Sequence, residues 1–209
     1  MRIADILTFS LIDYPGYPSA VIFTAGCNLR CPWCHNWEIA YGNKGISDIR
    51  VENILEGRLK ERVKAICVSG GEPTINEDLP EFLDYIKKIG YMLKLDTNGT
   101  NPEMVKTVIE KVDYIAIDVK SSPERYPLLT GVERNYWPEV SESIKMARKS
   151  KTSYELRMTY VPGLSDVRDI RFFAEFTKGE NAFLTIARST SKFKVSGDLP
   201  EKNLGIKIR

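Results

Sequence analysis

The chain has 209 residues, and its 30 Lys and Arg against 28 Asp and Glu give a formal net charge of +2. This length favours one domain with a core large enough to fold without disulfides or a structural metal. The near-neutral charge gives no reason to expect a nucleic acid or an anionic membrane as partner. No apolar run is long enough to cross a bilayer, and no hydrophobic signal segment opens the chain, so we expect a cytoplasmic protein.

Short β-branched or apolar runs alternate with amphipathic helical patterns along the chain. The predicted strands are residues 20–24, 65–69, 92–96, 114–119, 154–161 and 182–187. The predicted helices include residues 79–89, 102–112, 137–149 and 166–177. This alternation indicates a parallel sheet with right-handed crossovers. Six strand–helix units are too few to close an eight-stranded barrel, so we predict an α/β fold, a partial (β/α)6 TIM-type barrel, with a doubly wound open sheet as the alternative.

We expect a single domain over residues 1–209. It divides into an N-terminal lead-in (1–18), the partial barrel (19–187) and a C-terminal tail (188–209). Polar residues collect where the predicted strands end, and parallel α/β folds place their active sites at that edge. These polar residues include Glu72, Asp96, Asp118, Arg157 and Arg188. The sequence therefore predicts one shared site at the carboxyl edge of the sheet.

Three of the four cysteines lie in one loop after the first predicted strand. Cys27, Cys31 and Cys34 are separated by three and then two residues. Thiolates this close can each bind a different iron of a 4Fe–4S cluster and leave the fourth iron open for a ligand. Structural zinc is the main alternative, but it normally needs a second ligand pair, which the sequence lacks. Cys67 lies inside an apolar strand, and we expect it to be a buried core thiol rather than a fourth ligand.

The cysteine loop, with Trp33 ahead of its last cysteine, resembles the loop of the radical S-adenosylmethionine (SAM) superfamily. The resemblance continues in Ser69-Gly70-Gly71-Glu72-Pro73-Thr74 after the second predicted strand. Finer motifs are similar to those of glycyl-radical-enzyme activating enzymes, with the closest likeness to the short anaerobic ribonucleoside-triphosphate reductase activating proteins. These motifs are residues 11–16 (LIDYPG), 34–36 (CHN), 96–99 (DTNG) and 118–120 (DVK).

This resemblance implies a role for each matching residue. Cys27, Cys31 and Cys34 would hold one 4Fe–4S cluster, and the open iron would chelate SAM. The residues implied to contact SAM are Trp33, Asn36, Gly70, Gly71, Glu72, Asp96, Asn98, Asp118, Lys120 and Arg157. Of these, Gly70, Gly71 and Glu72 would support the amino group, while Lys120 would face the carboxylate. The resemblance thins out beyond residue 163.

The resemblance also implies a cation, a partner and an electron donor. Asp96, Thr97 and Asp118 are similar to the oxygen-rich trio that binds a monovalent cation near SAM in related activating enzymes. The implied activity is reductive cleavage of SAM to a 5′-deoxyadenosyl radical, which installs a glycyl radical on a partner enzyme of the anaerobic ribonucleotide reductase or pyruvate formate-lyase type. Only Cys67 remains outside the loop, so we expect no second cluster and an external flavodoxin or ferredoxin as donor.

Two other functions compete with this interpretation. The first keeps the radical chemistry but acts on a small molecule, as 7-carboxy-7-deazaguanine synthase does. The second is a non-enzymatic Fe–S or zinc module for electron transfer or assembly. That module would need Cys67 as a ligand and would have no affinity for SAM.

Overall fold

The computed structural model of the chain describes residues 1–41, 51–199 and 206–208. Its strands are β1 (Ile3–Ser10), β2 (Ser19–Thr24), β3 (Ala65–Gly70), β4 (Met92–Thr97), β5 (Tyr114–Asp118), β6 (Ser153–Tyr160), β7 (Ala182–Ile186) and β8 (Lys207–Ile208). Its α-helices are α1 (Trp37–Ala40), α2 (Val51–Leu55), α3 (Leu59–Arg62), α4 (Leu79–Lys88), α5 (Pro102–Val108), α6 (Tyr126–Thr130), α7 (Trp137–Lys149) and α8 (Val167–Phe176). Three 3₁₀ turns, η1 (Pro73–Ile75), η2 (Ile109–Lys111) and η3 (Pro123–Arg125), complete the described elements.

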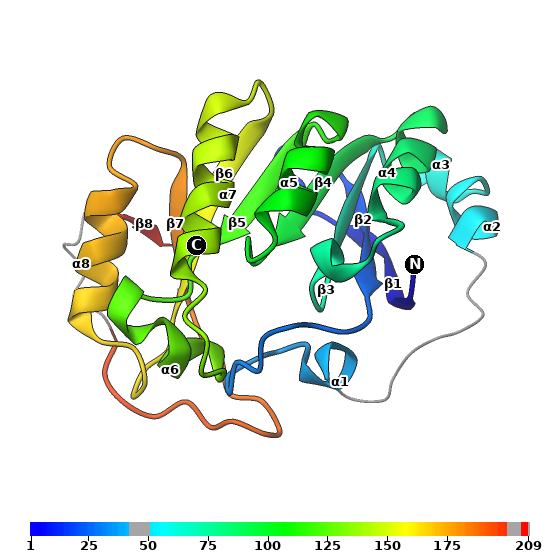
Figure 1. Cartoon of the computed structure of the whole chain (residues 1–209). Coiled ribbons are helices and arrows are strands. Elements are labelled where there is room, and N and C mark those ends of the chain that lie inside the picture. Colours follow the sequence, from blue (N-terminus) through cyan, green and yellow to red (C-terminus); the bar gives the residue numbers. More distant parts are fainter. Residues whose placement is uncertain (42–50, 200–205, 209) are drawn as a thin grey trace.

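The strands form one sheet in chain order, from β1 at one edge to β8 at the other. Strands β2 to β8 are parallel, and only β1 is antiparallel to its neighbour. Helices α4, α5, α7 and α8 cover one face of this curved sheet (Figure 1). The partial α/β barrel predicted from the six strand–helix units is confirmed.

Two strands lie outside the six that the sequence predicts. The lead-in contains β1, which extends the sheet beyond β2. Beyond the predicted barrel, the two-residue β8 pairs with β7. Of the expected C-terminal tail, residues 200–205 and 209 lie outside the described part of the chain.

The two faces of the sheet have opposite chemistry because side chains alternate along a strand. Leu93 and Leu95 of β4 and Ile115 and Ile117 of β5 belong to the apolar core shared with the helices. The residues that alternate with these leucines on β4, Lys94 and Asp96, turn to the inner face of the barrel, where they pair with each other. The inner face therefore carries the polar side chains from which a site can be built.

Helix caps stabilise the elements around this inner face. Asp166 caps α8 with its side chain and forms a reciprocal capping box with Asp169. Asn101 caps α5 by accepting a hydrogen bond from the backbone N–H of Met104 at 3.3 Å. Across residues 1–41, 51–199 and 206–208, no helix combines the length and apolar character needed to span a membrane.

Candidate active site

The cysteine loop runs from β2 to α1 across the carboxyl edge of the sheet. It is anchored to the far side of the barrel by Trp33, whose indole N–H donates to the carbonyl of Leu129 at 3.1 Å. The backbone N–H of Arg30 donates to the carbonyl of Thr130 at 2.8 Å. In Figure 1 this loop, α1, α6 and the segment after β7 gather at one end of the sheet. Elements far apart in sequence thus enclose the three thiols.

A cavity of about 260 Å³ opens beneath this loop and is lined by Cys27, Cys31 and Cys34 together. In the described part of the chain, no three His, Cys, Asp or Glu side chains are grouped to hold a single metal ion. A 4Fe–4S cluster takes each thiolate on a different iron. The three cysteines that line this cavity therefore fit such a cluster.

The three thiols lie in a desolvated environment. Burial raises the pKa of Cys27 to about 12 and that of Cys31 to about 11. Burial also raises the pKa of Cys34. The thiols therefore carry protons until a metal displaces them, because metal ligation requires the thiolate.

Gly70 and Gly71 lie where β3 ends against the cysteine loop. A Cβ on Gly71 would come within 1.8 Å of the carbonyl oxygen of Gly26. A Cβ on Gly70 would come within 2.3 Å of the Thr24 backbone nitrogen, and Gly70 also has a φ of +121°. Glycine is required at both positions because two backbone segments pass too close to each other for a side chain. This packing requirement is separate from any contact with a ligand. Both also line the cavity, where their backbone is open to a ligand.

Glu72 is 1% exposed and connects β3 to the end of β4. Its Oε1 accepts hydrogen bonds from the Thr74 hydroxyl and the Thr97 hydroxyl, each at 2.6 Å, and from the Thr74 N–H at 3.0 Å. Its Oε2 accepts from the Asn98 N–H at 2.7 Å. Burial raises the pKa of Glu72, and these hydrogen bonds oppose the rise. Glu72 thus holds the DTNG turn of residues 96–99 in place.

The Asn98 side chain connects this turn to the cysteine loop. Its side-chain N–H₂ donates to the side-chain Oδ1 of Asn28 at 3.0 Å and lies 3.9 Å from the Cys27 sulfur. The Leu29 N–H also donates to the Cys27 sulfur, at 3.4 Å. The first cysteine of the loop is therefore hydrogen-bonded from both sides.

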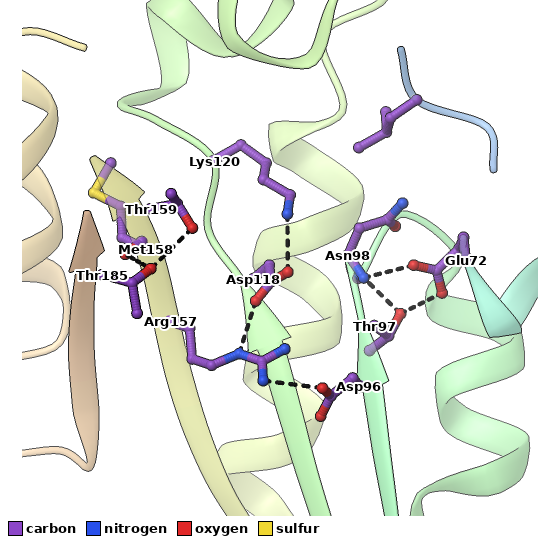
Figure 2. A network of polar contacts seen from close by, with 12 residues as sticks. Glu72, Asp96, Thr97, Asn98, Asp118, Lys120, Arg157, Met158, Thr159 and Thr185 are labelled. Atoms are coloured by element: carbon purple, nitrogen blue, oxygen red, sulfur yellow. Dashed lines mark hydrogen bonds and ion pairs between the residues drawn. The ribbon is translucent and has the colours of Figure 1, made fainter. Parts of the chain in front are cut away.

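Acidic and basic side chains alternate across the inner ends of β4, β5 and β6, and Figure 2 shows them pointing toward one another. The Arg157 guanidinium donates to Asp118 at 2.9 Å and to Asp96 at 3.0 Å. Lys120 donates to the second oxygen of Asp118 at 2.8 Å. Burial alone would raise the pKa of Asp118, but Arg157 and Lys120 hold it well below its ordinary value.

Lys120 also lies over the Trp33 ring, with its Nζ 5.3 Å from the ring centroid. The Lys120 ammonium thus contacts both Asp118 at the end of β5 and Trp33 in the cysteine loop. Asn36, just beyond Cys34, donates to the Gly70 carbonyl at 3.4 Å. The cavity is lined by all the residues for which the sequence predicts a SAM contact: Trp33, Asn36, Gly70, Gly71, Glu72, Asp96, Asn98, Asp118, Lys120 and Arg157.

The trio predicted to bind a monovalent cation is arranged differently. The Thr97 hydroxyl donates to Glu72, and both Asp96 oxygens are paired with cationic groups, Lys94 at 2.9 Å and Arg157 at 3.0 Å. A monovalent cation needs several oxygen ligands that face one open position. The Asp118 oxygens are likewise paired, with Arg157 and Lys120, so the side-chain oxygens of the trio are already engaged within the chain and do not fit the implied cation.

Some residues of the site were not anticipated. Lys94 ends within bonding distance of Asp96, and its charge inside an otherwise apolar strand was the available signal. Tyr41 lines the cavity and donates its hydroxyl to the Cys31 carbonyl at 3.1 Å. Cys67, predicted to be a core thiol, is fully buried in β3 and is not among the residues that line the cavity.

A second cavity of about 590 Å³ lies beside the first. It is lined by the loop of residues 11–16 and by Thr159 and Thr185. It shares Asp118 and Arg157 with the first cavity. These two side chains form a common wall between the cysteine loop and the N-terminal loop.

A mostly parallel α/β partial barrel with a three-cysteine loop at its carboxyl edge is the architecture of a SAM-dependent radical enzyme. The sequence matches the radical SAM superfamily over residues 21–176, and the chain belongs to that superfamily. Members of this superfamily use a 4Fe–4S cluster and SAM. The three cysteines and the cavity described above fit both cofactors.

Relatives of this chain differ in their described activities. A Methanocaldococcus jannaschii protein named "putative glycyl-radical enzyme activating enzyme" is 36% identical over 182 residues, which cover 84% of this chain and 75% of that protein. The 7-carboxy-7-deazaguanine synthase of Neisseria meningitidis serogroup B is 38% identical over 107 residues, which cover 51% of this chain and 45% of the synthase.

Solved structures share the fold at low sequence identity. SuiB from Streptococcus suis, bound to S-adenosylmethionine, is 16% identical with a TM-score of 0.66, over 86% of this chain and 43% of SuiB. QueE from Escherichia coli is 18% identical with a TM-score of 0.55, over 91% of this chain and 84% of QueE. These likenesses support the partial barrel and carry no statement about the substrate.

Proposed function

We propose that the protein cleaves SAM reductively and uses the radical to install a glycyl radical on a partner enzyme, of the anaerobic ribonucleotide reductase or pyruvate formate-lyase type. The observation that carries the proposal is the common wall of Asp118 and Arg157 between two cavities. One cavity holds the cofactor residues, and the other offers a route to them along the N-terminal loop. A polypeptide entering along that loop would reach the place where the radical forms.

Different residues of the first cavity bind the cluster and the separate groups of SAM. Cys27, Cys31 and Cys34 hold the 4Fe–4S cluster. With SAM bound, this cofactor pair supplies methionine and a 5′-deoxyadenosyl radical after one electron is added, and the radical takes a hydrogen atom from the substrate. The Lys120 ammonium would face the SAM carboxylate, and the Gly70 and Gly71 backbone would support the amino group. Trp33 and the packed loop limit water access.

A protein substrate is favoured by the surface at the mouth of the second cavity. Leu11 and Ile12 line this cavity and are 69% and 83% exposed. Apolar side chains this exposed on a loop are suited to contact another protein, since they gain from burial on association. A soluble flavodoxin or ferredoxin supplies the electron.

The first test of the proposal is electron paramagnetic resonance of the anaerobically reconstituted, reduced protein with and without SAM. We expect a cluster signal that changes on addition of SAM, together with formation of 5′-deoxyadenosine. A Cys67→Ala variant should keep the cluster. A signal unaffected by SAM, or loss of the cluster from Cys67→Ala, would favour the non-enzymatic module.

The second test separates the two substrate classes. The reduced protein is incubated with SAM and a candidate glycyl-radical enzyme from the same genome, and a parallel sample contains the small-molecule substrate of a 7-carboxy-7-deazaguanine synthase. We expect a glycyl radical signal from the partner and no deazaguanine product in the parallel sample. Deazaguanine product instead would establish the function suggested by the Neisseria meningitidis relative.

A further inference from the structure

A partly buried network of ion pairs lies on the inner face of the barrel, and four of its six members line the first cavity. Its carboxylates are Asp96, Asp118 and Glu155, and its cationic groups are Lys94, Lys120 and Arg157. Three acidic and three basic groups balance within this described network. The six side chains of the network therefore have a net formal charge of zero without a bound metal ion.

Lys94 is the least expected member, because it is 2% exposed in the interior of β4. Its ammonium lies 2.9 Å from Asp96 and 3.7 Å from Glu155. It also donates to the carbonyl of Asp13 at 2.9 Å. Removing an ammonium from water is costly unless opposite charge and hydrogen bonds compensate for the lost hydration. Such compensation is what these three partners provide.

Arg157 occupies the place between the two strand-end carboxylates. Its Nε faces Asp118 and one terminal nitrogen faces Asp96, so the planar guanidinium bridges β4 and β5 (Figure 2). Guanidinium geometry is suited to such paired contacts with carboxylates. The remaining Asp96 oxygen faces Lys94, and the remaining Asp118 oxygen faces Lys120.

We propose that Arg157, supported by Lys94, supplies as fixed side-chain charge what a bound monovalent cation supplies in related activating enzymes, so that this protein needs neither K⁺ nor Na⁺. A metal cation entering between Asp96 and Asp118 would meet the guanidinium in its place and the Lys94 ammonium close by. Like charges at such short distances repel one another. Thr97, the third oxygen of the expected trio, is already engaged with Glu72.

The inference rests on the likeness to activating enzymes that also underlies the proposed function. Its test uses the cluster-free chain, so its outcome is independent of SAM cleavage and of the proposed function. The melting temperature is measured in potassium, sodium and tetramethylammonium chloride at equal ionic strength. We expect equal melting temperatures for the wild-type chain in all three salts. A saturable rise specific to K⁺ or Na⁺ would overturn the proposal.

A variant tests whether the Arg157 guanidinium occupies a position between Asp96 and Asp118 that could otherwise bind a metal cation. Arg157→Gln removes the bridging charge and leaves Asp96 and Asp118 facing an open position. We expect a saturable stabilisation by K⁺ or Na⁺ over tetramethylammonium in this variant and none in Arg157→Lys, which keeps the charge. Equal melting temperatures of Arg157→Gln in all three salts would contradict the proposal.

Lys94→Met supplies the second variant if Arg157→Gln does not fold. It removes the buried ammonium at nearly constant side-chain length, so Asp96 loses one of its two cationic partners. We expect K⁺ or Na⁺ to raise its melting temperature selectively, while Lys94→Arg behaves like the wild type. Absence of any selective rise in Lys94→Met would show that Lys94 does not replace a cation.

Discussion

Gly71 lies where the end of β3 passes the cysteine loop, and the space there excludes a side chain. A Cβ would come within 1.8 Å of the Gly26 carbonyl oxygen, so Gly71→Ala must push the loop away from the sheet. We expect a loss of stability of about 1–3 kcal/mol and a lower iron content after reconstitution. Thermal unfolding and iron analysis measure both effects.

The matched control for this change is Gly179→Ala. Gly179 has a φ of +82° but no atom within 4 Å of a built Cβ, so alanine there introduces backbone strain without a clash. We expect Gly179→Ala to reconstitute iron like the wild type. Equal iron content in Gly71→Ala and the wild type would show that the loop does not depend on this close approach.

Glu72 illustrates a carboxylate that is held by hydrogen bonds alone. Both of its oxygens accept from donors that cannot turn away, including the backbone N–H groups of Thr74 and Asn98. In Glu72→Gln an amide N–H₂ must face one of these donors, so we expect a loss of about 1–3 kcal/mol in the free energy of unfolding. Urea denaturation measures the loss, and the exposed Glu77→Gln should remain within about 0.5 kcal/mol of the wild type. A Glu72→Gln variant as stable as Glu77→Gln would contradict this account.

At the scale of elements, α8 and the turn after β5 are tied together by one buried carboxylate. Asp169 accepts from the Ser122 N–H at 3.0 Å, from the Ser122 hydroxyl at 2.7 Å and from Arg125 at 3.1 Å. It also accepts from the Asp166 N–H at 2.8 Å to complete the capping box. This turn directly follows Lys120, so the anchor also fixes the side of the site that carries the ammonium.

Asp169→Ala should therefore destabilise the protein by about 3 kcal/mol, because several buried donors lose their acceptor at once. Asp166→Ala removes the helix cap and a solvent-accessible ion pair with Arg168, and should cost about 1 kcal/mol. Denaturant unfolding of the two variants compares the anchor with the cap. A similar loss in both would indicate that the connection to the turn adds nothing.

The sequence predicted the elements well where a run was long and periodic. The helix predicted over residues 137–149 is α7 (Trp137–Lys149), and the strand predicted over residues 92–96 is β4 (Met92–Thr97). Strand β1 escaped prediction because its burial does not alternate, with Leu7 and Phe9 exposed. The two-residue β8 is too short for any pattern.

The members of the site were predictable, but their pairing was not. Position in the last part of a predicted strand was enough to nominate Asp96, Asp118 and Arg157. Their partners depend on the register between β4, β5 and β6, where Asp118 lies opposite Arg157. Lys94 lies two residues before Asp96 on the same face, and only the folded sheet shows that its charge turns inward.

At the scale of the whole molecule, the open sheet places the cofactor cavity and the second cavity on either side of Asp118 and Arg157. If a partner's loop enters through the second cavity, its docking depends on the exposed apolar residues there, and Ile12 is 83% exposed. We expect Ile12→Asp to slow formation of the glycyl radical about tenfold or more, since a charge at an apolar contact opposes docking. Cleavage of SAM in the absence of partner should stay at the wild-type rate, because Ile12 does not line the cofactor cavity.

The control for Ile12→Asp is Leu199→Asp, which places the same charge at another exposed aliphatic residue, one that lines neither of these two cavities. Radical formation is followed by electron paramagnetic resonance, and SAM cleavage by the 5′-deoxyadenosine produced. If Ile12→Asp slowed both reactions equally, the loop would support the cofactor site rather than the partner. If it slowed neither, the partner would reach the radical by a route that avoids the second cavity.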